Sequence, residues 1–267
     1  MRVAVCQFAA GTDVTANAAQ CEQLIRDAAA AGAHLAVLPE ASMYFDPRHQ
    51  GGPGPHGQAM DGPFASAISS VAASAGIAVL VGMLESAGDA DDKRDYNTLL
   101  AIGNDGAVLG SYRKIHLYDA FGYRESEDYL PGDIDEPLTF PIGEITVGAA
   151  TCYDLRFPEV FRWLVDAGAD LVALPSAWIA GHTKELAWRT LVTARAIENT
   201  IYLAAADQSG PVSCGQSIVV DPMGTVIAGV GERPGLAVAE VTPEVIESVR
   251  QRNPSLANRR FSVAPLR

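Results

Sequence analysis

The sequence contains few cysteines, and their arrangement is not typical of a metal site or a disulfide framework. The four cysteines, at positions 6, 21, 152 and 214, include no CxxC pair and have no histidine nearby at zinc-site spacing. We therefore expect no metal and no cofactor. Cys6 lies within a predicted strand and Cys21 on the apolar face of a predicted helix, as small buried hydrophobic residues do.

Positive charge is also scarce. The chain has 19 Lys plus Arg residues against 32 Asp plus Glu residues, which gives a net charge of −13. Because nothing in this balance attracts a phosphate backbone, we do not expect nucleic acid as a partner.

Long apolar runs are missing as well. No uninterrupted apolar segment approaches the roughly 20 residues that span a bilayer. The opening MRVAVCQF passes directly into a strand pattern without the apolar core of a signal peptide. We expect no membrane partner and a cytoplasmic location. Hydrophobic residues make up 48% and charged residues 19% of the chain, which is enough apolar material for a large globular core.

The order of apolar patterns indicates an α/β protein. RVAVCQF (2–8) reads as a buried strand, apolar residues recur at helical spacing between positions 14 and 28, and HLAVLPE (34–40) reads as the next strand. Such a βαβ unit implies parallel pairing. Further helices are predicted near 64–75, 158–167 and 184–198. Further strands are predicted at 77–82, 145–151, 170–175 and 201–206.

Two hairpins and two irregular segments complete the pattern. Residues 96–114 and 216–229 each predict a pair of strands joined by a tight turn, so the sheets should be mixed. Residues 43–63 and 116–133 are irregular, and the first, dense in Gly and Pro, is a candidate loop over a site.

One piece of the sequence occurs twice. AGAHLAVLPE (31–40) and AGADLVALPS (167–176) share the pattern AGAxLxxLP, each after a predicted helix. This repetition predicts two similar layers related by an approximate internal twofold. Because no linker separates them, we interpret residues 1–267 as a single domain.

Three polar residues follow apolar strands, at the sheet edge where α/β proteins bind ligands: Glu40, Lys114 and Cys152. A thiolate is a nucleophile, a carboxylate can accept the thiol proton, and an ammonium group can stabilise an oxyanion. This set is typical of acyl transfer through a thioester. A Cys152–His116 pair and a redox thiol are competing hypotheses, although no resolving cysteine is evident for the second.

These residues lie in motifs that resemble those of the nitrilase, or carbon–nitrogen hydrolase, superfamily. LAVLPE is similar to its glutamate motif, YRKIHLYD to its lysine motif and CYDLRFPE to its cysteine motif, in the same order. The resemblance extends along the chain through LPSAW (174–178), ARAIEN (194–199), GQSIVVDPMG (215–224) and NPSLANRR (253–260).

The resemblance implies an αββα sandwich of two mixed sheets that pairs with a second subunit as a homodimer or higher oligomer. It implies Glu40 as general base, Lys114 as oxyanion stabiliser and Cys152 as nucleophile, with the backbone N–H of Tyr153 as second oxyanion donor. A further glutamate helps to position the substrate in many members. Glu125 fits that pattern better than Glu127.

The cysteine motif resembles the branch of the superfamily that hydrolyses amides. True nitrilases tend to have Trp after the nucleophile, where this chain has Tyr153. We therefore expect an omega-amidase-like or aliphatic amidase-like hydrolase of small linear amides. The alternatives are an N-carbamoyl amine amidohydrolase, a nitrilase, or a non-catalytic binding protein on the same scaffold. Gln216 stands where many relatives have His, and the sequence does not explain this change.

The remaining predictions concern the walls of the pocket. Ser176, the counterpart of Glu40 in the repeated piece, and Trp178 are expected there as substrate-positioning residues. Arg156 and Arg195 are candidates for binding a substrate carboxylate. Other aromatic candidates for the wall are Tyr44, Phe45, Tyr118 and Phe121.

Overall fold

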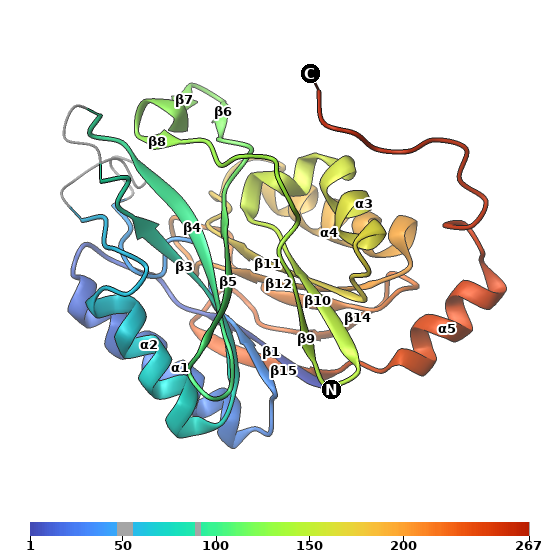
Figure 1. Cartoon of the computed structure of the whole chain (residues 1–267), viewed down its shortest axis with the longest axis horizontal. Helices are drawn as coiled ribbons and strands as arrows, with labels where there is room; N and C mark the ends of the chain where they lie inside the picture. Colours follow the sequence, from blue (N-terminus) through green and yellow to red (C-terminus); the bar gives the residue numbers. More distant parts are fainter. Residues whose placement is uncertain (47–55, 89–91, 267) are drawn as a thin grey trace.

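The computed structural model describes residues 1–46, 56–88 and 92–266. It contains two large mixed sheets that pack face to face, with helices on their outer sides (Figure 1). This arrangement confirms the predicted αββα sandwich.

The first sheet has three parallel strands, β1, β2 and β3, at its centre and antiparallel neighbours on either side. The short strand β8 is added to it alongside β4. In spatial order its strands are β15 (Gly235–Glu240), β1 (Arg2–Gln7), β2 (Leu35–Val37), β3 (Ala78–Glu85), β4 (Asp95–Ile102) and β5 (Val108–Arg113), with β8 (Tyr129–Leu130) on β4.

The second sheet repeats this plan, with β10, β11 and β12 as its three central parallel strands. In spatial order its strands are β9 (Thr139–Ile142), β10 (Ile145–Ala149), β11 (Leu171–Ser176), β12 (Tyr202–Asp207), β13 (Ile218–Val220) and β14 (Val226–Gly229). The strand β2 that leads to Glu40 and the strand β11 that ends on Ser176 therefore hold equivalent central places.

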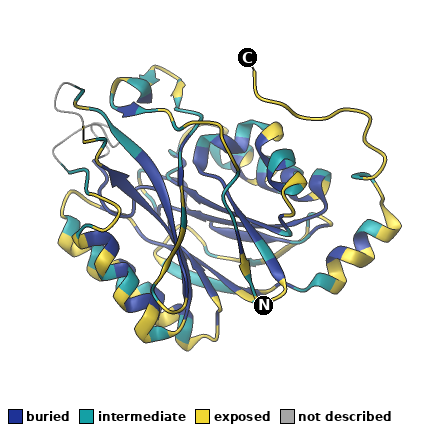
Figure 2. Ribbon diagram, viewed as in Figure 1, coloured by how far each residue is buried: buried dark blue, intermediate teal, exposed yellow. Residues whose placement is uncertain are grey.

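Helices cover the two outer faces, and apolar side chains fill the three layers between. Helices α1 and α2 lie on the first sheet, and α3 and α4 on the second (Figure 1). A third apolar cluster fills the space between the sheets. The central strands of both sheets are largely buried on both faces, whereas the helices expose one side (Figure 2), so these strands are mainly apolar. The helices are α1 (Val14–Ala30), α2 (Pro63–Ala75), α3 (Pro158–Asp166), α4 (Lys184–Asn199) and α5 (Pro243–Arg252).

The two predicted hairpins are present as β4–β5 and β13–β14. The irregular segment 116–133 contains the short strands β6 (Asp119–Ala120) and β7 (Tyr123–Arg124) and the 3-10 turn η1 (Glu125–Glu127). In the other irregular segment, residues 47–55 lie outside the described residues. Sequence analysis missed β9, β15 and α5, although GLAVAE is strand-like and Pro243 is well suited to a first helical turn. Among the described helices, none has the length and apolar character needed to cross a membrane.

Candidate active site

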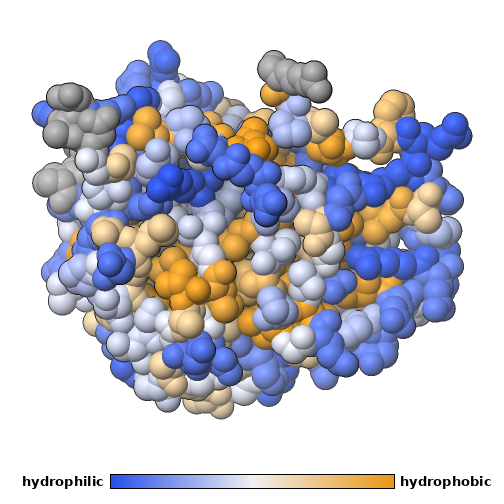
Figure 3. Space-filling model, in the orientation of Figure 1, coloured by the Kyte–Doolittle hydropathy of each residue, from blue (hydrophilic) through white to orange (hydrophobic). Residues whose placement is uncertain are grey.

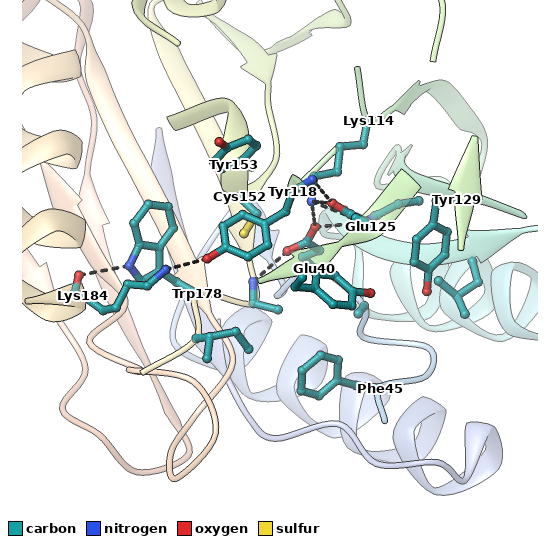
Figure 4. Close-up of a pocket in the computed structure, with 16 residues that line it drawn as sticks. Glu40, Phe45, Lys114, Tyr118, Glu125, Tyr129, Cys152, Tyr153, Trp178 and Lys184 are labelled. Carbon is teal, nitrogen blue, oxygen red and sulfur yellow. Dashed lines mark hydrogen bonds and ion pairs between the residues drawn. The ribbon is translucent and has the colours of Figure 1, made fainter. Parts of the chain in front are cut away.

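Glu40, Lys114 and Cys152 meet in one cavity of about 50 Å³, as Figure 4 shows. Glu40 comes from the segment after β2, Lys114 directly follows β5, and Cys152 follows β10 at the start of the 3-10 turn η2 (Cys152–Arg156). All three side chains are buried. Residues that are far apart in the sequence and come from both sheets thus face one small space, where a group of the size of a carboxamide has room.

Three donors hold the Glu40 carboxylate. Its Oε1 accepts hydrogen bonds from Lys114 Nζ and Asn97 Nδ2, both at 2.8 Å, and its Oε2 accepts one from the Ala177 backbone N–H at 2.9 Å. Burial alone would raise the pKa of Glu40, but the charge and hydrogen bond of Lys114 outweigh it and lower that pKa. The carboxylate is therefore ionised at neutral pH, as a general base must be.

A close backbone approach brings Glu40 into the site. Ala41 has a left-handed conformation, with φ of 55°. The chain there passes over Gly82 of β3, where an added Cβ would lie 2.7 Å from the Ala41 nitrogen and 2.8 Å from the Glu40 Cα. Only glycine leaves room for this turn.

Lys114 lies between two carboxylates. Its Nζ is 2.8 Å from Glu40 Oε1 and 2.9 Å from Glu125 Oε2. Burial would lower the pKa of Lys114, but Glu125 and Glu40 hold it well above its usual value. Of the two predicted candidates, Glu125 is the buried one, whereas the Glu127 side chain is 67% exposed and lies beside Arg124.

Cys152 has an unusual backbone conformation at the end of the strand. Its φ of 42° is rare for a residue with a side chain and indicates local strain at the proposed nucleophile. Burial, followed by the charge of Glu40, raises the pKa of the thiol well above its ordinary value. The resting state is therefore a neutral thiol beside a carboxylate. Tyr153, the next residue, lines the same cavity.

His116 lies near the site but binds a different partner. Its Nδ1 is 2.8 Å from Oδ1 of the buried Asp154, and its ring stacks on Phe157 with the centroids 3.7 Å apart. Asp154 also accepts hydrogen bonds from the Tyr112 hydroxyl and from the Thr151 backbone. This geometry supports a role in bracing the turn that carries Cys152 rather than a Cys–His pair.

The structure corrects the predicted position of Ser176. Its side chain is fully buried, and its hydroxyl makes only a long contact of 3.5 Å to the Leu174 carbonyl. Within the described part of the chain, the cavity wall includes the next two residues, Ala177 and Trp178, and not Ser176. The strand ends on Ser176, so the chain turns toward the cavity one residue later than we predicted.

Three of the five predicted aromatic residues line the cavity, namely Trp178, Phe45 and Tyr118. Tyr44 stacks on His56, and Phe121 is 76% exposed; neither belongs to the lining.

Of the two predicted arginine candidates, Arg195 has a structural role. It donates to the Leu155 carbonyl and pairs with Glu198 at 2.9 Å. The Arg156 guanidinium lies against Trp178. Gln216 lines a separate open groove beside α4 and β14. Its backbone carbonyl accepts a hydrogen bond from the Trp188 indole N–H.

Several lining residues escaped the sequence analysis. Asn97 lies near the start of β4 and donates to both Glu40 and Glu125. In the sequence, Asn97 could have been recognised as a polar residue within the otherwise mainly apolar strand YNTLLAI. Ala177 acts through its backbone N–H, which no side-chain letter reveals. Lys184, at the start of α4, donates to the Tyr118 hydroxyl at 2.8 Å.

Comparison with known proteins places this site among related ones. The family model described as carbon-nitrogen hydrolase matches residues 2–251. The chain is 37% identical to a deaminated glutathione amidase from Escherichia coli O157:H7 over 262 residues, 98% of each protein. It is 35% identical to the deaminated glutathione amidase of Homo sapiens over 276 residues, 97% of this chain and 82% of that protein.

Two solved structures are similar along most of this chain. The amidase from Nesterenkonia sp. AN1 has a TM-score of 0.79 and 27% identity, with 97% of this chain and 94% of that chain covered. In that structure the acetamide moiety of fluoroacetamide is added covalently to the active-site cysteine. The NitFhit protein of C. elegans has a TM-score of 0.84 and 30% identity over 97% of this chain and 65% of that chain.

Proposed function

Because the chain belongs to the carbon–nitrogen hydrolase family, we propose that it is an amidase that hydrolyses a small linear amide to a carboxylic acid and ammonia. One observation carries this proposal: a neutral thiol, an ionised carboxylate and a buried ammonium group line the same cavity. These three groups allow the sulfur to attack an amide carbonyl while the thiol proton is removed and the S–C bond forms.

In the first half of the reaction, the sulfur of Cys152 bonds to the amide carbon while Glu40 accepts the thiol proton. Lys114 uses two of its three N–H groups on Glu40 and Glu125, which leaves one for the oxyanion. The backbone N–H of Tyr153 is the proposed second donor. The C–N bond then breaks, Glu40 returns its proton to nitrogen, and ammonia leaves a thioester on Cys152.

In the second half, water adds to the thioester carbonyl and Glu40 accepts its proton. The C–S bond breaks, the thiolate takes the proton back from Glu40, and the acid is released. Glu40 is thus the base in both halves, which agrees with its position between donors from two sheets. Glu125 and Asn97 are proposed to hold Lys114 and Glu40 in place, and Trp178 to bound the substrate.

N-carbamoyl amines and nitriles are chemically open to the same thiol. An amide gives acid and ammonia, and a nitrile gives the same two products by way of a thioimidate. A carbamoyl compound gives carbon dioxide, ammonia and amine. Product analysis on a panel of these compounds separates the three classes. A non-catalytic binding protein would turn over none of them.

Trapping of the acyl-enzyme tests the mechanism. Acid quenching during amide turnover, followed by intact-mass measurement, should show the mass of one acyl group on the wild-type chain. Cys152→Ala should lose both the adduct and the turnover, whereas Cys214→Ala, which changes another buried thiol, should keep both. Full activity in Cys152→Ala would overturn the proposal.

We also propose that two copies associate through the C-terminal segment 253–266. This segment arcs along the outside of the molecule (Figure 1) and is held to the end of α3 by an ion pair between Arg259 and Asp166, with Phe261 91% and Leu266 100% exposed. Apolar side chains also gather on the visible surface over β5 and β9 (Figure 3), where Val108 is 53% exposed. The full chain should be a dimer by light scattering, and a chain ending at Arg252 a monomer.

Two further proposals concern organisation and location. The chain forms one domain, because both sheets contribute to the core between them. It resides in the cytoplasm, where four unpaired cysteines are normal. Limited proteolysis and cell fractionation are the corresponding tests.

A further inference from the structure

The end of β12 contacts both sides of the hydrogen bond between Ala177 and Glu40. Asp207 is the last residue of β12, and its Oδ1 accepts a hydrogen bond from the Trp178 backbone N–H at 2.7 Å. The next residue, Gln208, donates from its Nε2 to the Glu40 carbonyl at 2.8 Å. Two consecutive residues therefore hold the wall of the cavity and the backbone of the proposed base.

Two neighbouring backbone N–H groups donate to two different carboxyl groups. The Ala177 N–H donates to Glu40 Oε2 at 2.9 Å, and the Trp178 N–H donates to Asp207 Oδ1. Because planar peptide units link the two nitrogens, the direction of one N–H restricts the direction of the other. The Trp178 carbonyl is also held, since it accepts the Cys214 N–H at 2.9 Å. The Trp178 indole and Glu40 face the same cavity (Figure 4).

The two carboxyl groups have opposite surroundings. Glu40 lies beside the Lys114 ammonium group, whereas Asp207 is fully buried and forms no ion pair with any of the described residues. Burial raises the pKa of Asp207 well above its ordinary value although the Trp178 hydrogen bond opposes this, and the charge of Glu40 raises it further. Its Oδ2 lies 3.2 Å from the Cys214 thiol. Asp207 thus accepts the Trp178 N–H as a neutral acid at neutral pH and adds no charge beside the base.

Gln208 has a single orientation in which its amide can bond to Glu40. Its side chain is buried, and its Oε1 accepts the Ala10 N–H at 2.7 Å. Its backbone N–H donates to the Ser176 carbonyl at 3.1 Å. Gln208 therefore connects the segments that follow β1 and β2 to the end of β11.

We propose that Asp207 and Gln208 are positioning residues of the enzyme, which orient the Ala177 N–H and the Glu40 carboxylate toward each other. This proposal rests on the proposed amidase function. Neither residue is among the described residues that line the cavity, so both act through Glu40 and not on the substrate. A hydrogen bond to the ionised form lowers the pKa of a carboxyl group, so a displaced Ala177 N–H should raise the pKa of Glu40.

Removing the acceptor tests this role. Asp207→Leu should lower kcat/KM at neutral pH about tenfold to a hundredfold on an amide that the wild type cleaves. The fall of kcat/KM at acid pH should begin at higher pH, because Glu40 then binds its proton more readily. Asp207→Asn keeps an oxygen for the Trp178 N–H and should retain most of the activity and the wild-type pH profile. Gln208→Met breaks the bond to the Glu40 carbonyl and should act like Asp207→Leu, which keeps the test decisive if the latter does not fold.

Two controls separate positioning from a loss of stability. Cys214→Ala removes the thiol beside Asp207 and leaves the Trp178 bond in place, so the pH profile should not change. Asn199→Leu removes a fully buried hydrogen bond to the Arg195 carbonyl at the end of α4. It should lower the melting temperature and leave the pH profile as in the wild type.

The outcomes distinguish this inference from the function beneath it. If Asp207→Leu and Gln208→Met lower the melting temperature but keep kcat/KM and its pH profile, the positioning role is wrong and the amidase proposal stands. A loss in Asp207→Asn as large as in Asp207→Leu would overturn the role of Asp207 as a neutral acceptor. If the wild type hydrolyses no amide, both proposals fail.

Discussion

The helix–strand piece that leads to Glu40 and the one that leads to Ser176 have matching backbones. Each helix is followed by a glycine in the left-handed region, Gly32 with φ of 79° and Gly168 with φ of 96°. The next polar side chains, His34 and Asp170, each accept a hydrogen bond from a backbone N–H of the adjacent strand, β1 or β10. Different letters thus make equivalent contacts, which shows that the repetition is structural.

The two pieces differ where their strands end. In the first sheet the chain turns over Gly82 and presents the Glu40 carboxylate, whereas in the second it continues to Ser176 and presents the Ala177 N–H. That N–H donates to Glu40 Oε2 at 2.9 Å. The first helix–strand piece supplies the carboxylate acceptor and the second supplies the N–H donor. The two similar pieces thus meet in one hydrogen bond.

The largest expected effect comes from removing the acceptor. Glu40→Gln keeps the shape of the side chain but loses the base, and turnover should fall about 10²- to 10⁴-fold. Glu127→Gln is the matched control, because Glu127 is exposed on the nearby turn. A comparable loss in the control would contradict the assignment of Glu40.

The pH profile should show the same carboxylate. The active form needs Glu40 ionised, and its pKa is lowered, so kcat/KM should fall only when the pH drops below the ordinary glutamate range. The pKa of the Cys152 thiol is raised, which places the alkaline limb above the ordinary thiol range. Over the pH range in which the protein stays folded, kcat/KM should therefore be constant near neutrality. The fall at acid pH should be absent from the residual activity of Glu40→Gln.

A carboxylate can also be placed in the second sheet, at Ser176, which is the position equivalent to Glu40. Ser176→Glu puts a charge at a fully buried place that lacks the donors around Glu40. We expect the free energy of unfolding to drop by about 3–5 kcal/mol. Denaturant melts would measure it, with Ser86→Glu on the surface as control. An unchanged melt would mean that the second sheet can host the same base.

A substitution at Gly82 tests the close backbone approach that brings Glu40 into the site. The register of the strands places Ala206 of β12 where Gly82 stands in β3, so the second sheet accepts a methyl group at this place. Gly82→Ala should displace Glu40, lowering kcat/KM about 10- to 100-fold and stability by about 1–3 kcal/mol. Gly231→Ala, which has open space around it, should change neither.

The smallest effect is expected for Ser176→Ala. The Ser176 hydroxyl makes one long contact, so its loss should cost less than about 1 kcal/mol and leave kcat/KM unchanged. Ser42→Ala, which removes a buried 2.6 Å hydrogen bond to the Pro39 carbonyl, should cost more. A clear loss of activity in Ser176→Ala, with none in Ser42→Ala, would support the predicted contact between Ser176 and the substrate.

The fold and the three central residues could be predicted because their signals are local. Apolar runs mark the strands, and a polar letter directly after a run marks the sheet edge. Lys114 and Cys152 stand out in this way. Glu125 was identified only by resemblance, since its partner Lys114 lies across an irregular segment.

Residues whose contribution depends on tertiary contacts could not be predicted in this way. Ala177 contributes a main-chain donor, and Asn97 gains its position only when β4 lies beside Glu40. Ser176 was misplaced because a repeat in the letters does not show where each chain turns. His116 was near the site, but only the structure shows its pairing with Asp154.

The hydrogen bond from the Ala177 N–H to Glu40 also makes the position of the proposed base depend on how the two sheets are aligned. Glu40 takes Lys114 and Asn97 as donors from the first sheet and Ala177 from the second. A slide of one sheet along the other would stretch one set of bonds while leaving the other intact. The apolar layer between the sheets keeps them aligned, so we expect substitutions within it to alter turnover as well as stability.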